Sequence, residues 1–376
     1  MLLRRQTRLA LTLGLIALPF GLASQPAAAQ FSPDDLKALT EIVEKGIADQ
    51  RQPGLNVGIW IPGRGDWVAS FGKADIKTGT PMKVGDHVRI ASVTKSFTGV
   101  ATLLLVDQGK LSLEDKLSRF IKGIPNGDII TIRNLLGMTS GIYDFSSDEQ
   151  FLKDFTANPS MPFSSDDMIA IVKRHQPDFA PGEKVVYCDT NFAFLGVIIE
   201  KVTGKHAGVV IEELILQPLK LADTSYPTTT SMPEPYSRGY YAGEDGEGES
   251  VDYTAVNPAI TSSAGAMIST LDDLRIWAKA LATGALLKPQ THAEQIKFGV
   301  MVKTPVVTVS YGLGIANFGG LIGHNGAIFG YTTAMFYVPE FDATLVLEGN
   351  QSSNSSSATT LIAIDLAKYL FPDLIK

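Results

Sequence analysis

The sequence predicts an α+β fold: a mainly antiparallel sheet built from both ends of the chain and flanked by helices, with a mostly helical lobe inserted at about residues 100–285. Two observations predict it. Strand-like segments occur at residues 55–71 and again at 306–348, and helical signals dominate from Ser92 to about Ala280. One sheet that draws strands from both ends satisfies this order with short, uncrossed connections.

Residues 1–29 have the pattern of a secretory signal peptide. Three arginines precede the apolar run Leu9 to Leu22, and Ala27-Ala28-Ala29 supplies small residues for cleavage. The run is too short to span a membrane. The cleavage point has no cysteine to which a lipid anchor could be attached. We therefore expect a chain that is exported, periplasmic or secreted, begins near Gln30 and has no stable membrane anchor.

The remaining elements follow from local patterns. Ser32-Pro33 predicts the start of an amphipathic helix that runs to about Ala48. Two strands separated by the turn 62–65 come next, then the helical middle. The end of the chain predicts four more strands, at 306–315, 321–324, 331–338 and 343–348. A last helix with one apolar face is predicted at 359–370.

The composition excludes several classes of function. The formal net charge is −7, and removal of residues 1–29, which hold three arginines and no acids, makes it −10. No basic residues cluster, so nucleic acid is not an expected partner. The single cysteine, Cys188, cannot form an internal disulfide, and five scattered histidines give no metal-ligand pattern. We expect neither a metal nor a cofactor.

The most informative motif is Ser92-Val93-Thr94-Lys95, at the start of an apolar helical run. Such strings arise by chance, and a second copy, Ser70 to Lys73, ends a predicted strand, where residues three apart face opposite sides. On a helix, residues three apart share a face. Lys95 can then reach the Ser92 hydroxyl and accept its proton, with helix N-terminal N–H groups near the reacting oxygen.

Two further segments accompany this motif. Residues 181–192 contain Tyr187-Cys188-Asp189 and lead into an apolar helix, and residues 323–331 place His324-Asn325-Gly326 between two strand-like segments. In order and spacing these motifs resemble those of the serine β-lactamase and penicillin-binding-protein-like hydrolases, over roughly residues 50–350. The nearest likeness is to class C β-lactamase-like proteins and serine D-alanyl-D-alanine carboxypeptidases. The resemblance implies a single β-lactamase/transpeptidase-like hydrolase domain for residues 30–376.

The resemblance also implies a role for each matching residue. Ser92 would attack a carbonyl and become acylated, and Lys95 would help to remove its proton. Tyr187 would share protons with Lys95, protonate the leaving group and help activate the deacylating water. His324 would line the pocket and hydrogen-bond toward Tyr187 or a substrate carboxylate. The other four histidines are expected to be structural.

The third motif implies an oxyanion hole and a substrate-binding strand. The backbone N–H groups of Ser92 and Ala327 would bind the oxyanion, and Asn325 belongs to the same segment. Gly326 has no side chain, which would let substrate lie along the strand edge.

Asp189 departs from the family pattern, in which the second motif usually reads Tyr-x-Asn. An ionised aspartate cannot donate a hydrogen bond to a substrate carbonyl, but it can pair with Lys95 or with a cation on the substrate. Asn191 belongs to the helix start and is not expected to replace it. The stretch before His324, from Tyr311 to Ile322, also contains no lysine or arginine for a substrate carboxylate. Aminopeptidase or esterase chemistry therefore stays open.

The leading prediction is an exported serine hydrolase that acts through an acyl-enzyme on a D-alanyl peptide or a related amide or ester. Its substrate would be a small molecule or a peptide such as a cell-wall peptide. A promiscuous carboxylesterase and a β-lactamase on the same scaffold are the alternatives. A β-lactam-binding or sensor protein without useful turnover is the alternative of another class, and Lys95 and Tyr187 argue against it, because a binder needs no groups to activate Ser92.

Overall fold

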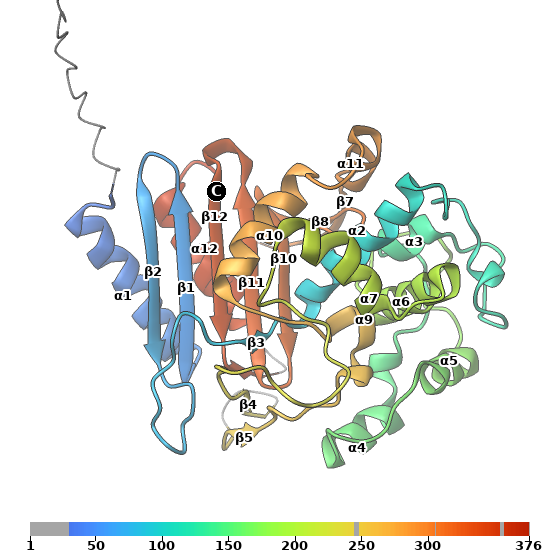
Figure 1. Ribbon diagram of the computed structural model, residues 1–376, viewed down its shortest axis with the longest axis horizontal. Helices are drawn as coiled ribbons and strands as arrows, with labels where there is room; N and C mark the ends of the chain where they lie inside the picture. The colour runs from blue at the N-terminus through green and yellow to red at the C-terminus, as the bar shows by residue number, and fades with distance from the viewer. Residues whose placement is uncertain (1–29, 244–247, 305, 354–356, 376) are drawn as a thin grey trace, which may run out of the picture.

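An eight-stranded antiparallel sheet forms one half of the molecule in this computed structural model, which describes residues 30–243, 248–304, 306–353 and 357–375 (Figure 1). The expected signal peptide, residues 1–29, lies outside the described residues. The strand order is β2-β1-β12-β11-β10-β9-β8-β7, so the start of the chain joins its end where β1 pairs with β12, as predicted. The strands are β1 (Gly54–Ile61), β2 (Gly65–Gly72), β7 (Gly299–Lys303), β8 (Thr308–Tyr311), β9 (Ala316–Phe318), β10 (Leu321–Ile328), β11 (Tyr331–Val338) and β12 (Ala343–Gly349).

Helices cover both faces of this sheet. The first helix, α1 (Pro33–Asp49), begins after Ser32 as expected, with a capping box in which Ser32 and Asp35 exchange hydrogen bonds. It packs on α12 (Ala358–Leu370), which covers one face of β11 and β12, while α10 (Leu271–Thr283) crosses the other face (Figure 1).

The helical lobe lies beside β10 and holds the remaining long helices (Figure 1). Its central helix, α2, is buried nearly all round, because it packs on α6 and α9 and because Gly99 allows close contact with Gly314. The other helices are α2 (Thr94–Asp107), α3 (Ile132–Leu136), α4 (Glu149–Ala157), α5 (Ser165–Arg174), α6 (Asp189–Thr203), α7 (Ala207–Ile211), α8 (Gln217–Leu219), α9 (Ser262–Gly265) and α11 (Pro289–Gln295).

Short strand pairs connect the lobe to the sheet. They are β3 (Val88–Arg89) with β6 (Ile268–Ser269), and β13 (Gln351–Ser352) with β4 (Tyr240–Tyr241) and β5 (Val251–Asp252). The first pair holds the segment just before Ser92 against the segment just after α9. Pairings of two residues carry no periodic pattern, and the sequence did not predict them. Among the described residues, no helix is both long and apolar enough to cross a membrane.

Candidate active site

Ser92 lies on a single 3-10 turn, Ala91–Val93, directly before α2. The preceding residue, Ala91, has φ 49°, a left-handed conformation that is costly for a residue with a side chain. Strand β10 packs closely against this turn: a Cβ at Gly326 would lie 2.5 Å from the Ile90 carbonyl oxygen and 2.9 Å from the Ser92 nitrogen. Only glycine therefore fits at position 326, because β10 contacts the turn that carries Ser92. The predicted reason was a different one, namely room for substrate along the strand.

Lys95 is fully buried and meets Ser92, as the helical spacing predicts. Its Nζ lies 2.9 Å from Ser92 Oγ and donates to the Ala264 carbonyl oxygen at 2.8 Å. The same nitrogen lies 2.6 Å from Asp189 Oδ1. Asp189 thus pairs with Lys95, one of the two arrangements that the sequence left open. Lys95 Nζ thus has two hydrogen-bond acceptors, Ser92 Oγ and the Ala264 carbonyl oxygen, and one ion-pair partner, Asp189.

Tyr187 closes the site from the loop before α6. Its ring centroid lies 4.8 Å from Lys95 Nζ, and its hydroxyl hydrogen-bonds with Ser92. Burial of the hydroxyl, and next the negative charge of Asp189, raise the pKa of Tyr187 well above its usual value, although the hydrogen bond with Ser92 opposes the shift. Tyr187 is therefore a neutral phenol at neutral pH, able to donate a proton but not to act as a resting base.

Asp144 stands behind Asp189 and was not predicted from the sequence. One carboxylate oxygen accepts the Asp189 backbone N–H at 2.9 Å, and the other accepts the Ser146 N–H at 3.1 Å. Burial, and next the charge of Asp189, raise the pKa of Asp144 to about 6. Asp144 thus fixes the first turn of α6, and its own charge changes near neutral pH.

His324 lies in β10, which includes the predicted strand 321–324 and continues to Ile328, and it is 1 % exposed. Its Nδ1 lies 2.6 Å from the Asn325 carbonyl oxygen, which only an N–H can approach, so Nε2 accepts the Tyr311 hydroxyl hydrogen at 3.0 Å. Burial lowers the pKa of His324 to about 3, with the positive charge of Lys95 contributing. The ring centroids of His324 and Tyr187 are 6.4 Å apart, and Tyr311 stacks edge-on against both rings. His324 therefore does not bond directly to Tyr187. It hydrogen-bonds with Tyr311, which packs against the Tyr187 ring.

Asn325 does not line the site, contrary to its predicted substrate-binding role. Alternate residues of a strand face opposite sides, so Asn325 points away from His324 and donates to Thr360 Oγ1 on α12 at 3.0 Å. The next residue but one, Ala327, lines the same cavity as Ser92. β9 pairs with β10 only at residues 321–323, which leaves the β10 edge beside Ala327 without a strand partner from β9.

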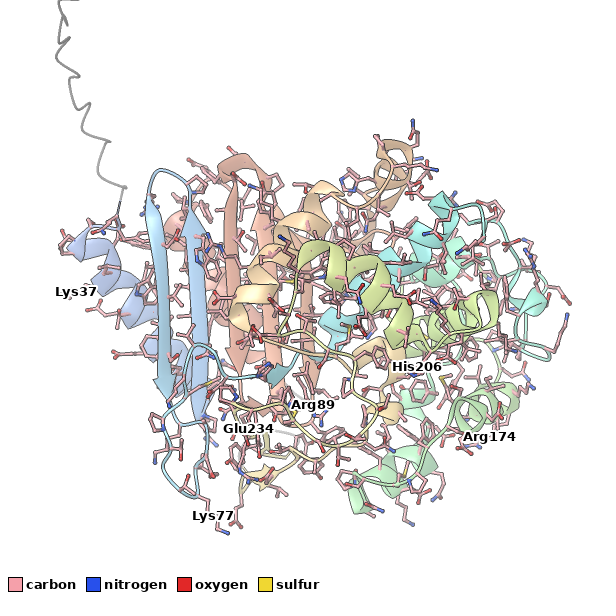
Figure 2. All side chains as sticks on the ribbon, viewed as in Figure 1. Lys37, Lys77, Arg89, Arg174, His206 and Glu234 are labelled. Atoms are coloured by element: carbon pink, nitrogen blue, oxygen red, sulfur yellow. The ribbon has the colours of Figure 1, made fainter. Side chains whose placement is uncertain are left out.

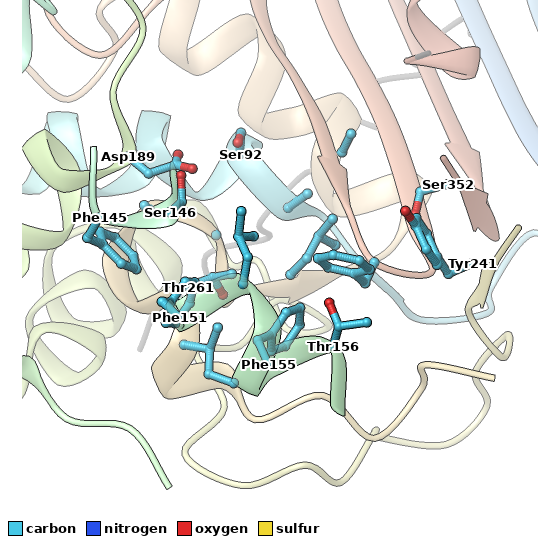
Figure 3. Close-up of a pocket in the computed structure, with 18 of the residues that line it drawn as sticks. Ser92, Phe145, Ser146, Phe151, Phe155, Thr156, Asp189, Tyr241, Thr261 and Ser352 are labelled. Carbon is cyan, nitrogen blue, oxygen red and sulfur yellow. The ribbon is translucent and has the colours of Figure 1, made fainter. Parts of the chain in front are cut away.

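A cavity of about 580 Å³ opens beside Ser92 (Figure 3). Its wall includes α4, the 3-10 turn at 145–146, the end of β4 with residues 242–243, and the end of β10 with Phe329, and aromatic rings form much of it. Phe329 packs against Phe155 and Tyr241, with ring centroids 4.7 Å apart in each pair. Of the described residues that line the cavity, Asp189 alone carries a formal charge, and its side chain is 32 % exposed.

The remaining histidines and Asn191 lie outside this arrangement, as expected. Asn191 is buried and accepts the Ser140 hydroxyl hydrogen at 2.5 Å. His175 stacks on Tyr143 and contacts Asp148. His87 and His292 contact Pro235 and Gln295, respectively.

The site therefore combines a hydroxyl, an amine and a phenol within hydrogen-bonding reach, next to an apolar cavity. An amine in its neutral form can keep two N–H groups on Ala264 and Asp189 and direct its lone pair at Ser92 Oγ, which is the geometry of a serine with its own base. Asp144, Tyr311 and the Ala264 carbonyl complete the arrangement. Their positions come from loops and sheet packing, so no motif in the sequence indicated them.

Comparison with known proteins gives one family over most of the chain. The family model described as Beta-lactamase matches residues 39–368. Protein flp of Staphylococcus aureus is 29% identical over 251 residues, which are 65% of this chain and 49% of that protein. This chain thus spans about half the length of the curated relative.

Two solved structures cover nearly the whole described chain. A D-stereospecific amidohydrolase from Streptomyces sp. is 29% identical with a TM-score of 0.78, over 89% of this chain and 98% of that one. A D-amino acid amidase from Ochrobactrum anthropi SV3, complexed with L-phenylalanine, is 25% identical with a TM-score of 0.79, over 89% and 98%.

Proposed function

The chain belongs to the Beta-lactamase family and is a serine hydrolase, and we propose that it is exported and cleaves amides of apolar D-amino acids through an acyl-enzyme on Ser92. The observation that carries this proposal is the Ser92, Lys95 and Tyr187 triangle at the mouth of an aromatic cavity whose single described charge is the carboxylate of Asp189.

In the proposed reaction, neutral Lys95 accepts the Ser92 proton as Oγ attacks the substrate carbonyl. The backbone N–H groups of Ser92 and Ala327 stabilise the oxyanion, a contribution typically of several kcal/mol. The proton then passes through the neutral Tyr187 phenol to the leaving amine, and the C–N bond breaks. Water then attacks the resulting ester while Lys95 accepts its proton. The ester C–O bond breaks, the proton passes to Ser92 Oγ, and the free acid leaves.

The cavity supports an apolar acyl side chain and a free amino group. Phe145, Phe151 and Phe155 can surround an aromatic or aliphatic side chain, which buries its surface. Asp189 lines the same cavity and is accessible enough to meet a substrate ammonium as well as Lys95. The D-configuration rests on the two amidase relatives.

The D-alanyl-D-alanine carboxypeptidase alternative is less well supported. Its substrate ends in a carboxylate, which calls for a cation, and no lysine or arginine is among the described residues that line the cavity. A carboxylesterase needs no such cation and is therefore the second candidate. Asp189 argues against efficient β-lactam turnover, because a carboxylate cannot donate the hydrogen bond that the family's asparagine amide offers to a substrate carbonyl.

A hydrolysis panel tests the proposal. We expect D-phenylalaninamide to be cleaved at least ~10-fold faster, as kcat/KM, than L-phenylalaninamide, N-acetyl-D-phenylalaninamide or a D-alanyl-D-alanine peptide. p-Nitrophenyl butyrate and nitrocefin complete the panel, and Ser92→Ala is the control. Full activity in Ser92→Ala would refute the nucleophile. Faster turnover of the butyrate ester alone would favour the esterase.

Export is tested separately. The pattern of residues 1–29 supports it, and fractionation of cells that express the full chain should place a shorter form, beginning near Gln30, outside the cytoplasm. An uncleaved protein found only in the cytoplasm would contradict this part of the proposal.

A further inference from the structure

A second cavity, of about 300 Å³, lies in the helical lobe on the other side of α9 from the catalytic cavity. The two cavities share α9 as a wall: Ala264 and Gly265 line the catalytic one, and Ser262 and Ser263 line the second. The remaining wall comes from the start of α5, the middle of α6, the start of α7 and two loops, with residues Phe163, Ser164, Ser165, Gly196, Val197, Glu200, His206, Tyr226, Pro227, Thr228, Pro258 and Ala259.

The wall of this cavity carries one carboxylate and several hydroxyls. Glu200 Oε1 accepts the Ala207 N–H at 3.2 Å and lies 3.6 Å from His206 Nε2. His206 Nδ1 accepts the Gly208 N–H, so a neutral His206 ring carries its hydrogen on Nε2, facing Glu200. No lysine or arginine is among the described lining residues, and His206 lies at the surface of the lobe (Figure 2). A cation that enters the cavity can therefore meet the Glu200 carboxylate, whose nearest basic neighbour is the imidazole of His206.

The hydroxyl groups are positioned by close packing. A Cβ at Gly196 would lie 2.2 Å from Ser263 Oγ, so glycine lets α6 approach Ser263. The Ser263 hydroxyl in turn lies 3.1 Å from the Tyr226 hydroxyl. Ser262 has φ 47°, a strained conformation for serine, and its side chain lines the cavity. Strain of this kind is concentrated at functional sites.

The same short helix holds the catalytic lysine. The Ala264 carbonyl accepts from Lys95 Nζ at 2.8 Å, and the Ser263 carbonyl accepts from Thr98 Oγ1 at 2.7 Å. A molecule that contacts Ser262 and Ser263 on one side of α9 can therefore shift the Ala264 carbonyl, which accepts the Lys95 hydrogen bond on the other side. The shared wall is a physical connection between the two cavities.

We propose that this cavity binds a small hydroxylated ammonium compound, such as an amino sugar or an amino alcohol, and that binding changes turnover at Ser92 through α9. The ammonium group pairs with Glu200, and the hydroxyls of the ligand exchange hydrogen bonds with Ser262, Tyr226 and Thr228. Binding itself does not depend on the substrate proposed above, whereas the effect on turnover does rest on hydrolysis at Ser92.

Titration calorimetry with D-glucosamine as the probe tests the binding. We expect the wild-type protein and the Asp189→Asn variant to bind it equally, which separates this cavity from the catalytic one. Glu200→Gln, which can still accept the Ala207 N–H, should weaken binding at least tenfold, and the exposed Glu212→Gln is the matched control. D-Glucose, which lacks the ammonium group, should bind at least tenfold more weakly.

A blocking variant guards against a folding artefact. Thr228 is exposed, so Thr228→Trp should fill the cavity without disturbing the core and should abolish binding. No binding by the wild type at tens of millimolar probe, or equal binding by Glu200→Gln, would overturn the site.

Kinetics test the connection to Ser92. Saturating glucosamine should change the kcat of the best substrate in the panel at least twofold in the wild type and not in Glu200→Gln. Binding with unchanged kcat would overturn the connection through α9. If no substrate is turned over, the proposed function fails, while binding to Ser92→Ala would still support the site.

Discussion

Lys95 Nζ lies 2.6 Å from Asp189 Oδ1, where the family pattern has an uncharged asparagine. The same nitrogen lies 2.9 Å from the Ser92 oxygen that it must deprotonate. Opposite charges at this distance attract each other. The ion pair therefore holds Lys95 beside Ser92, and the carboxylate leaves no amide N–H at position 189 for a substrate carbonyl.

Replacement of Asp189 by asparagine should speed acylation by β-lactams. The variant supplies an amide N–H for a substrate carbonyl, which the carboxylate lacks. We expect the rate of Ser92 labelling by a fluorescent penicillin to rise about tenfold, equivalent to about 1.4 kcal/mol of barrier. Asp365→Asn, an exposed carboxylate on α12, is the control. An unchanged labelling rate in Asp189→Asn would remove this argument.

Asp144 should make substrate binding depend on pH. Because the pKa of Asp144 is raised to about 6, its carboxyl is neutral at pH 5 and mostly charged at pH 6.5 or above. Ionisation adds a negative charge beside Asp189, so the KM for D-phenylalaninamide should fall roughly threefold over this range. The KM for a neutral ester should not change. In Asp144→Asn, the pH dependence of the amide KM should disappear.

A spectroscopic measurement checks the same group without a substrate. Carbon NMR of labelled aspartate side chains should show one carboxyl that titrates near pH 6 and is missing in Asp144→Asn. The exposed Asp154→Asn on α4 should retain it. A resonance near pH 6 that survives in Asp144→Asn would assign the titration to another residue.

Long periodic segments were predicted closely, because burial of one face leaves a regular pattern. The predicted strand 331–338 is β11, and the predicted helix 359–370 differs from α12 by one residue. β7 was missed because its residues are mostly exposed at the edge of the sheet. The predicted strand 321–324 was too short: β10 continues to Ile328, and Gly326 lets it pack on the Ser92 turn.

Contacts in the site were predictable when both residues lie on one helix or strand. Contacts between residues of different helices or strands were not. Ser92 and Lys95 share a helix start, so their contact follows from spacing. The contact of Lys95 with the Ala264 carbonyl joins residues 169 positions apart, and no local pattern records it. Asn325 was misassigned because the motif was treated as a unit, whereas strand alternation turns every second side chain away.

The aromatic wall of the catalytic cavity should select for apolar acyl groups. Phe155 is 2 % exposed and packs against Phe151 and Phe329. Phe155→Ala should reduce kcat/KM about tenfold for p-nitrophenyl phenylacetate and leave p-nitrophenyl acetate nearly unchanged, because only the larger acyl group reaches the wall. Phe341→Ala, on the far side of the sheet, is the control. Equal losses for both esters would indicate a general structural defect instead of lost specificity.

Glu348 should lower the stability of the protein at neutral and alkaline pH. It lies on β12 opposite Asn56 and Thr333, is fully buried, and has no lysine or arginine within ion-pair distance among the described residues. Burial raises its pKa well above the usual value. A carboxyl whose pKa is higher in the folded than in the unfolded state stabilises folding below the unfolded value. That stability is lost as pH rises toward the folded value.

Glu348→Gln removes this titration and keeps the size and the hydrogen-bonding groups of the side chain. Each unit by which folding raises the pKa corresponds to about 1.4 kcal/mol, so the variant should gain about 1 to 3 kcal/mol in the free energy of unfolding between pH 5 and pH 8, relative to wild type. Urea unfolding at the two pH values measures the difference, with the exposed Glu340→Gln as the control. A difference between variant and wild type that stays constant with pH would mean that Glu348 is ionised in the folded protein over this pH range.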